Sequence, residues 1–302
     1  MIRLGIDLGG TKIEILALDE SGGERYRERV ATPGNNYAGT LSAIVSLVRN
    51  AETTLGETGT VGIATPGAVS RAPALNAGKI KNANSTCLNG QALADDLQNA
   101  LRRDVRIEND ANCFALSEAT DGAAAGAASV FGVILGTGVG GGICINGRIV
   151  TGANAIGGEW GHNPLPWPEP NELPGNACYC GQRGCVETWL SGPGLARHFI
   201  EVTGRALSAP EIVANAAQDS ACEAALAAYE NRLARSLATI INVLDPDVIV
   251  LGGGLSNVSR WYSSVPKIWS QYVFSDYVAT RLVPPKFGDS SGVRGAAWLW
   301  NN

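Results

Sequence analysis

A strand, a tight glycine turn and a second strand open each half of this sequence, and this repeated opening restricts the fold more than any other feature. Short strands are predicted at Arg3–Leu8 and Lys12–Leu18, on either side of Gly9-Gly10. A second pair is predicted at Val130–Leu135 and Ile143–Asn146, on either side of a glycine-rich turn. Alternating helical and strand patterns follow each opening. The repetition predicts two similar α/β lobes with a cleft between them.

Hydrophobic periodicity, punctuated by glycine and proline, places the other elements. Further strands are predicted at Glu24–Val30, Thr60–Ala64, about Val105–Glu108 and Asp247–Leu251. Helices are predicted at about Tyr37–Leu55, Gln91–Leu101, Gly194–Thr203, Ala221–Leu244 and from about Gly292 onward, with a proline-rich loop at Asn163–Gly175. The predicted domains are an amino-terminal lobe of residues 1–117, completed by a carboxyl-terminal helix at 291–302, and a second lobe of residues 118–290.

Glycine is the compositional outlier: the chain has 38 in 302 residues, where the usual share is about 7%. These glycines gather at predicted strand ends, where backbone approaches a ligand closely.

Acidic residues outnumber basic ones by 28 to 23, for a net charge of −5. No basic surplus is present for nucleic acid or an anionic membrane, so neither partner is expected. The amino terminus reaches Asp7 without a long apolar run, so a cytoplasmic protein is expected.

Three glycine loops at strand ends have the composition of phosphate-binding backbone. Bare amides and a threonine hydroxyl form a concave donor surface that suits phosphate oxygens. The middle loop also fits G-x-G-x-x-G, but a strand follows it where the dinucleotide motif needs a helix. Simple hairpin turns are the alternative, because glycine is the ordinary turn residue. The candidate nucleotide-binding residues are Asp7, Gly9, Gly10, Thr11, Lys12, Gly136, Thr137, Gly138, Gly140, Gly253 and Gly254.

Three of the seven cysteines are close in sequence, which in a cytosolic protein points to metal or redox chemistry. Cys178, Cys180 and Cys185 follow His162 with the spacing H-x15-C-x-C-x4-C. One imidazole and three thiolates complete a tetrahedral site with no open position, so structural Zn²⁺ is predicted in the loop 162–185. A Cys178–Cys185 disulfide and unligated thiols are the alternatives. The other cysteines are expected to be small buried hydrophobes, namely Cys87, Cys113, Cys144 and Cys222.

Four motifs together resemble the ROK family of sugar kinases over nearly the whole chain. They are Asp7-Leu-Gly-Gly-Thr-Lys12, Glu108-Asn-Asp-Ala-Asn112, Gly157-Gly-Glu-Trp-Gly-His162 and Cys178-Tyr-Cys-Gly-Gln-Arg-Gly-Cys-Val-Glu187. The resemblance implies the two-lobed actin-like ATPase fold and an enzyme that uses ATP and Mg²⁺ to phosphorylate the 6-hydroxyl of a hexose. Within the family, the stretches Asn82–Thr86 and His162–Trp167 look most like bacterial fructokinases that also accept mannose. N-acetylglucosamine kinase and glucokinase are the alternatives.

The resemblance implies a role for each matching residue. Asp110 is the expected general base, which takes the proton of the sugar hydroxyl; a helix N-cap is the alternative for an Asp that follows a strand. Asp7 is expected to help hold Mg²⁺ through water. Because buried unpaired carboxylates are costly, Glu159 and Glu187 are expected to be disordered or hydrated without sugar. The expected sugar ligands are Gly67, Asn84, Asn109, Asp110, Glu159, His162 and Glu187.

The resemblance also carries expectations about motion, assembly and an alternative function. His162 is expected to bind zinc with one ring nitrogen and a sugar hydroxyl with the other. The proline-rich loop is expected to act as a lid over the sugar, and His198 to pack or lie at the surface. A homodimer is the expected assembly. A sugar-binding regulator is the alternative function, disfavoured because Asp7 and Asp110 are present and the first phosphate loop begins at residue 7, which leaves no room before it for a DNA-binding domain.

Overall fold

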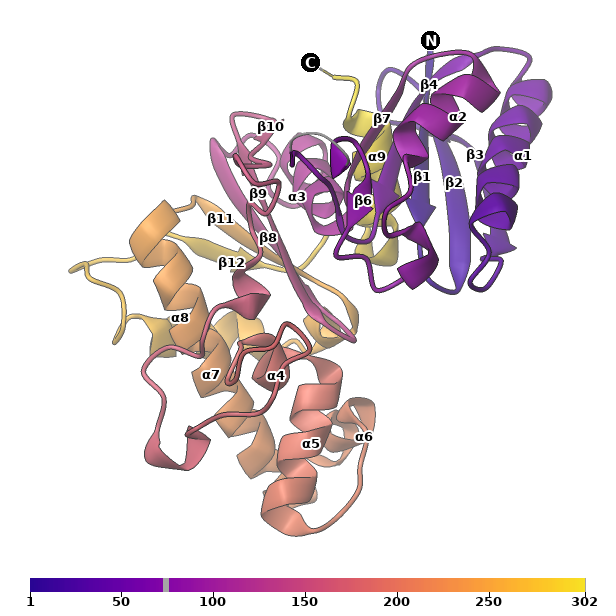
Figure 1. The fold of residues 1–302 in the computed structure, drawn as a ribbon. Helices are drawn as coiled ribbons and strands as arrows, with labels where there is room; N and C mark the ends of the chain where they lie inside the picture. Colours follow the sequence, from indigo (N-terminus) through magenta and orange to yellow (C-terminus); the bar gives the residue numbers. More distant parts are fainter. Residues whose placement is uncertain (73–75, 302) are drawn as a thin grey trace. The chain divides into compact units, whose positions relative to one another are not determined.

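The computed structural model describes residues 1–72 and 76–301, and the chain divides into two compact units (Figure 1). The first unit comprises Met1–Gly126, Gly142–Gly158 and Lys286–Asn302, and the second comprises Ala127–Gly141 and Glu159–Pro285. Two five-stranded mixed sheets with helices packed on them confirm the α/β class. The sequence-based boundaries, 1–117 with 291–302 and then 118–290, stay a prediction.

The sheet of the first unit has the strand order β3-β2-β1-β4-β7. Its strands β1 (Ile2–Leu8), β4 (Gly59–Thr65) and β7 (Val105–Asn109) are parallel, with β7 at the edge. The strands β2 (Lys12–Leu18) and β3 (Glu24–Ala31) join them as an antiparallel meander. All five strands were predicted from the sequence. Because parallel strands end at one edge, the turns after β1 and β7 both leave the sheet at its carboxyl edge.

Helices cover both faces of this sheet. The helices α1 (Tyr37–Leu55) and α2 (Leu93–Leu101) pack in one core cluster with the alternate apolar side chains of β1. On the opposite face, α9 (Ser291–Trp298) lies against the register partners Gly5 and Gly62. A Cβ at Gly5 would lie 2.1 Å from the Val293 carbonyl oxygen, so only glycine admits the helix at this distance. The helix α3 (Asp110–Thr120) packs on α9.

The second sheet has the strand order β10-β9-β8-β11-β12. The chain passes from the second unit to the first within β9. The predicted start of the return strand at Ile143 is wrong, because β9 begins at Val139. Its glycines lie within the strand, and a Cβ at Gly142 would lie 2.3 Å from the Ala111 carbonyl oxygen. The strands are β8 (Ser129–Leu135), β9 (Val139–Ile145), β10 (Arg148–Ile149), β11 (Val248–Gly252) and β12 (Arg281–Val283).

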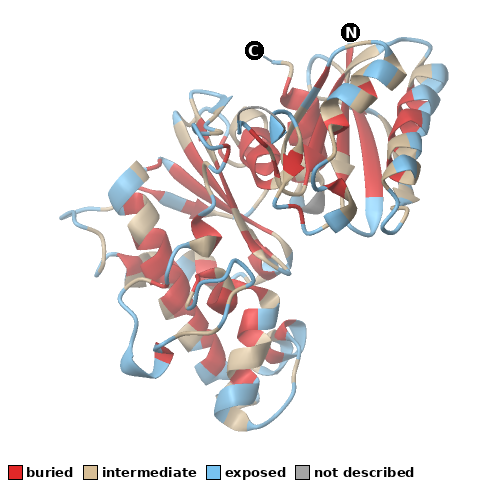
Figure 2. Cartoon of the chain, viewed as in Figure 1, coloured by how far each residue is buried: buried red, intermediate tan, exposed pale blue. Residues whose placement is uncertain are grey.

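The helices of the second unit pack around α7 (Ser220–Leu244), which is buried along much of its length (Figure 2). Asp219 caps its start by accepting a hydrogen bond from the Ala221 amide, as an N-cap carboxylate does. Tyr229 of α7 stacks on Trp261, with ring centroids 5.1 Å apart. The other helices are α4 (Glu187–Leu190), α5 (Gly192–Thr203), α6 (Ala209–Asn215) and α8 (Trp261–Trp269).

Short elements carry many of the candidate residues, and their brevity hides them from periodicity arguments. They are the strands β5 (Ala68–Val69) and β6 (Ile80–Lys81) and the 3-10 turns η2 (Thr86–Leu88), η3 (Trp160–His162), η4 (Pro170–Glu172), η5 (Gly254–Asn257) and η6 (Gly288–Ser290). Within residues 1–72 and 76–301, no helix has the length and apolar character needed to cross a bilayer.

Candidate functional site

The turn after β1 presents exposed backbone beside an acidic side chain. The Gly9 amide donates to the Lys12 carbonyl over 3.0 Å and so closes the hairpin. The hydroxyl of Thr32, directly after β3, supports the turn by donating to the Gly9 carbonyl over 2.7 Å. Gly10 and Thr11 remain exposed. The amides of the turn are therefore fixed in position and open to a phosphate group.

Asp7, the next-to-last residue of β1, lies in an acidic environment. Burial, together with the negative charges of Asp110 and Glu14, raises its pKa to about 7 against the opposing effect of Lys12. Glu14, its register partner on β2, is satisfied by ion pairs to Arg27 and Arg29. Asp7 and Asp110, 103 positions apart in sequence, thus belong to one electrostatic cluster of the first unit. A divalent cation would relieve this cluster, and carboxylate oxygens are ligands that suit Mg²⁺.

The turn from β7 into α3 positions Asp110. Asn109 is the N-cap of α3, and its Oδ1 accepts from the Ala111 amide over 2.9 Å and the Asn112 amide over 3.3 Å. Its Nδ2 donates to the Gly67 carbonyl over 2.9 Å. Asp110 is the first residue of the helix. The alternative reading of Asp110 as the N-cap is therefore wrong, because Asn109 has that role.

Glu108 holds the same turn from behind. Its Oε1 accepts from the Asn109 amide over 2.8 Å and from Asn112 Nδ2 over 3.1 Å. Its Oε2 accepts from the Thr151 hydroxyl over 2.9 Å. Sequence reasoning gave no role to Glu108 or Thr151, because these two residues are 43 positions apart and only the fold brings them into contact. These three bonds orient the backbone that carries Asp110.

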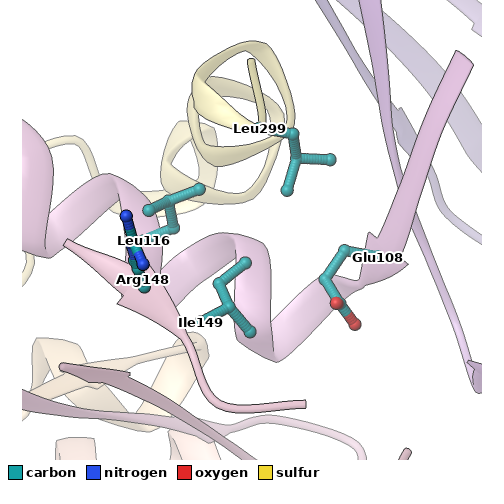
Figure 3. Close-up of a pocket in the computed structure, with 5 residues that line it drawn as sticks. All are labelled: Glu108, Leu116, Arg148, Ile149 and Leu299. Atoms are coloured by element: carbon teal, nitrogen blue, oxygen red, sulfur yellow. The ribbon is translucent and has the colours of Figure 1, made fainter. Parts of the chain in front are cut away.

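A cavity of about 380 Å³ adjoins Glu108 in the first unit (Figure 3). Leu116, Ile149 and Leu299 give it apolar walls, and Arg148 contributes a cation. The Glu108 carboxylate is already satisfied by the donors named above. The cavity therefore lies beside the turn that positions Asp110, and it offers no further acidic group.

Gly67 and Asn84 lie at the two ends of the β5–β6 hairpin. Gly67 has φ +77°, and a Cβ there would lie 2.3 Å from the Lys81 carbonyl oxygen, so the position requires glycine. Asn89 holds Ala83, the neighbour of Asn84, through two reciprocal hydrogen bonds of 2.9 Å. Asn84 itself is exposed. A fixed backbone thus presents the exposed side-chain amide of Asn84, an arrangement suited to binding a hydroxylated ligand.

In the second unit, the turn after β8 is tied to the start of α4. The Gly136 amide donates to the Gly138 carbonyl over 3.0 Å, and the Gly136 carbonyl accepts from the Gly192 amide over 2.8 Å. Glu187 accepts from the Val139 amide over 2.9 Å. Backbone thus satisfies one of the Glu187 oxygens, and the expectation that this side chain is disordered or hydrated without sugar stays a prediction. Glu159 is exposed.

The loop after β11 differs from a simple turn. Gly253 has φ +76°, and a Cβ there would lie 2.5 Å from the Leu135 carbonyl oxygen at the end of β8. Gly254 begins η5 and has open space around its Cα. The close packing of Gly253 leaves the Gly254 side of the loop accessible to a ligand.

The structure brings His162, Cys178, Cys180 and Cys185 together, with all four candidate ligand atoms within 4.8 Å of one another. The Cys180 and Cys185 sulfurs are 3.6 Å apart, and His162 Nδ1 is 3.6 Å from Cys178 Sγ. Zinc bonded to sulfur at about 2.3 Å and to nitrogen at about 2.0 Å in a tetrahedron requires separations of about 3.5–3.8 Å. The cluster fits zinc, whereas a disulfide needs about 2.05 Å. The one histidine and three cysteines of the motif stay candidate zinc ligands.

The second ring nitrogen of His162 has a partner that the sequence did not suggest. Its Nε2 lies 3.0 Å from the hydroxyl of Tyr179, and the two rings meet edge to face. Tyr179 is 81% exposed. This nitrogen was expected to bind a sugar hydroxyl. A sugar would first have to displace the Tyr179 hydroxyl from it.

A buried ion-pair network anchors the proline-rich loop. Glu172 in η4 binds Arg232 Nε over 2.7 Å and Arg235 over 2.8 and 2.9 Å, and both arginines come from α7. Arg235 also donates to the carbonyls of Pro166 and Trp167. A loop held in this way cannot swing without breaking buried charge pairs. The structure therefore argues against the expected lid.

The comparisons with known proteins agree on one family. The ROK family model matches residues 3–302. The chain belongs to the ROK family. An N-acetyl-D-glucosamine kinase of Yersinia enterocolitica is 40% identical over 300 residues, which cover 98% of each chain.

Two solved structures of the family are similar along nearly the whole chain. The ROK hexokinase of Thermus thermophilus has a TM-score of 0.86 at 30% identity, with 98% of this chain and 97% of that one covered. The ROK glucokinase of Streptomyces griseus, in complex with glucose and AMPPNP, has a TM-score of 0.77 at 27% identity and covers 99% of each chain. The resemblance is thus confirmed at the level of the family, and none of these three relatives is named a fructokinase.

Proposed function

We propose that this ROK chain is an ATP-dependent kinase that phosphorylates the 6-hydroxyl of a hexose. The observation that carries the proposal is the acidic cluster of Asp7 and Asp110 beside a fixed glycine turn. Phosphoryl transfer depends on positioning and charge stabilisation, with a carboxylate that accepts the proton of the hydroxyl. A carboxylate at a helix start, a cation-binding carboxylate and a phosphate-binding turn provide these parts in one unit.

Asp110 is proposed as the general base. Its backbone is held by the cap that Asn109 forms and by the three hydrogen bonds of Glu108. Asn109 Nδ2 has two protons and donates one to Gly67, which leaves the other for a sugar hydroxyl. The remaining proposed sugar ligands are Gly67, Asn84, Glu159, His162 and Glu187.

The nucleotide would be bound by glycine-rich backbone, with Asp7 as the ligand of Mg²⁺. Bound Mg²⁺ neutralises charge that develops on the transferred phosphoryl group. Because the pKa of Asp7 is raised to about 7, the cation competes with a proton at neutral pH. The proposed nucleotide contacts are Gly9, Gly10, Thr11, Lys12, Gly136, Thr137, Gly138, Gly140, Gly253 and Gly254.

N-acetylglucosamine is the proposed substrate. The Yersinia relative that bears this name is 40% identical over 98% of this chain. Glucose is the second candidate, because the Streptomyces glucokinase structure contains it. Fructose, the substrate expected from the sequence, has no support among these relatives. The structural zinc site and a homodimer are proposed alongside, the latter to be tested by sedimentation.

Coupled ADP release with Mg²⁺ and ATP tests the proposal on N-acetylglucosamine, glucose, mannose and fructose. Turnover highest with N-acetylglucosamine is expected. The matched variant Asp110→Asn keeps the shape of the side chain but cannot accept the proton, so it should lose at least about 100-fold in kcat and retain sugar binding by calorimetry.

The outcomes separate the alternatives. Turnover only with glucose or fructose would keep the reaction and overturn the substrate. Sugar binding without turnover in the wild-type protein would instead favour a regulator. Equal kcat for the wild type and Asp110→Asn would exclude Asp110 as the base.

A further inference from the structure

The second unit contains a cavity that the proposed kinase reaction does not use. It has a volume of about 390 Å³ and lies among α5, α7 and the η4 turn. Ala221, Ala224, Ala225 and Ala228 form its wall on one face of α7, at spacings of three and four residues. Volumes from about 300 Å³ upward are typical of small-molecule sites. The alanine wall makes this part of the cavity apolar.

Arg232, one helical turn beyond this wall, gives the cavity a cationic end. It is only 4% exposed, and its guanidinium stacks on the ring of Trp189 at 4.5 Å. Its Nε donates to Glu172 over 2.7 Å. Within residues 1–72 and 76–301, no group accepts a hydrogen bond from its two terminal nitrogens. Neither nitrogen is among the fully buried atoms without a partner, and Arg232 lines the cavity. A buried guanidinium thus offers one complete edge of donors to a ligand.

His198 on α5 lines the same cavity, and its ring contacts Trp189 from another side. Burial and the nearby Arg232 charge lower the pKa of His198 to about 4, so the ring is neutral at pH 7. No hydrogen bond to either ring nitrogen is formed within the described part of the chain. His198 can therefore donate to a ligand bound at Arg232 without adding charge.

The local charge balance favours an anion. Among the described residues, Glu172 is the buried carboxylate that pairs with Arg232, and it is shared with Arg235 through both of its oxygens. Two guanidinium groups against one carboxylate leave a net positive charge. Glu169 also lines the cavity, but it is exposed, and so solvent screens its charge.

We propose that this cavity binds a small organic monocarboxylate, with the carboxylate on the terminal edge of Arg232 and an apolar body against the alanines of α7. The free edge of a guanidinium matches the two oxygens of one carboxylate. The alanine wall suits a hydrocarbon body, and the polar side chains of Asn171, Thr203 and Asn231 line other parts of the cavity. The site is independent of kinase turnover, because none of its residues belongs to the proposed sugar or nucleotide site.

Hexanoate is the probe, and the ring signals of the two histidines are the readout by NMR. Hexanoate should shift the His198 signals and leave those of His162, at the candidate zinc site, unchanged. Hexan-1-ol, which has the same body without charge, and inorganic phosphate, an anion without the body, should bind at least about tenfold more weakly.

Three variants locate the ligand. Ala228→Leu fills the cavity without altering a charge and should weaken hexanoate binding at least about tenfold. Arg232→Lys keeps the charge but removes the pair of terminal guanidinium nitrogens, and hexanoate binding should weaken by a similar factor. Glu169→Gln should tighten binding about twofold at low salt, because it removes an exposed like charge.

Several results would overturn the proposal. They are hexanoate affinity unchanged by Ala228→Leu, hexan-1-ol binding as tightly as hexanoate, and phosphate binding as tightly as hexanoate. Absence of any His198 shift at about 10 mM hexanoate also overturns it, since even a millimolar Kd would be visible there.

Discussion

Substitution of Glu172 by Gln is expected to destabilise the second unit by about 3–5 kcal/mol. The Glu172 side chain is 3% exposed and those of Arg232 and Arg235 are 5% and 2% exposed. Its two oxygens make three charged hydrogen bonds of 2.7, 2.8 and 2.9 Å to these arginines. Glutamine keeps the volume but leaves two buried guanidinium groups without a counter-charge. Its side-chain NH₂ group would also face the N–H donors of the arginines, where Glu172 has an acceptor oxygen.

Urea unfolding followed by tryptophan fluorescence measures this loss. The control is Glu201→Gln on the surface of α5, which removes only an exposed ion pair of 4.0 Å and should change the free energy of unfolding by less than about 0.5 kcal/mol. A loss below about 1 kcal/mol for Glu172→Gln would refute the reasoning, because a buried charge would then have been removed without the expected penalty.

The pH dependence provides a second check on the same carboxylate. Burial would raise the pKa of Glu172, but its hydrogen bonds to Arg232, the Glu169 amide and Arg235 hold it below the ordinary 4.5. A lowered folded-state pKa gives stability that is present above the unfolded value and lost as the pH falls through the folded value. The difference between wild type and Glu172→Gln should therefore shrink in acid. A constant difference at all pH values would contradict the ion-pair account.

Three further predictions concern the candidate site. Glu108→Gln should lower kcat at least about tenfold with little change in sugar affinity, because Glu108 orients the turn that carries Asp110; unchanged kcat would contradict this role. The pKa of Asp7 is raised from 3.8 to about 7 by burial, Asp110 and Glu14, so the stability of metal-free protein should fall as pH rises through that interval. Asp7→Asn should flatten this profile, and urea titrations that show parallel curves would count against it. Cys185→Ser should contain less zinc than the wild-type protein and have a lower urea midpoint; equal zinc contents by metal analysis would exclude Cys185 as a ligand.

Much of the candidate site is encoded locally, and so the sequence was enough to predict it. The hairpin around Gly9-Gly10, the turn from β7 to Asp110 and the spacing of Cys178, Cys180 and Cys185 each lie within a few residues. Backbone sterics and ligand geometry operate over such distances, so a motif specifies them directly. The strands of the first sheet were likewise predictable, because short segments with apolar or alternating character lie between turn residues.

The tertiary structure alone decided what joins these pieces. It paired Glu187 with the Val139 amide 48 positions away, linked Glu108 to Thr151, and set Tyr179 against His162. It also fastened the proline-rich loop to α7 and left the terminal edge of Arg232 open to a cavity. These contacts depend on which elements pack together, and side-chain periodicity carries no information on the partner chosen across such separations. Sequence by itself therefore determined the reactive groups and their local turns, whereas packing determined which of them are satisfied and which remain available to a ligand.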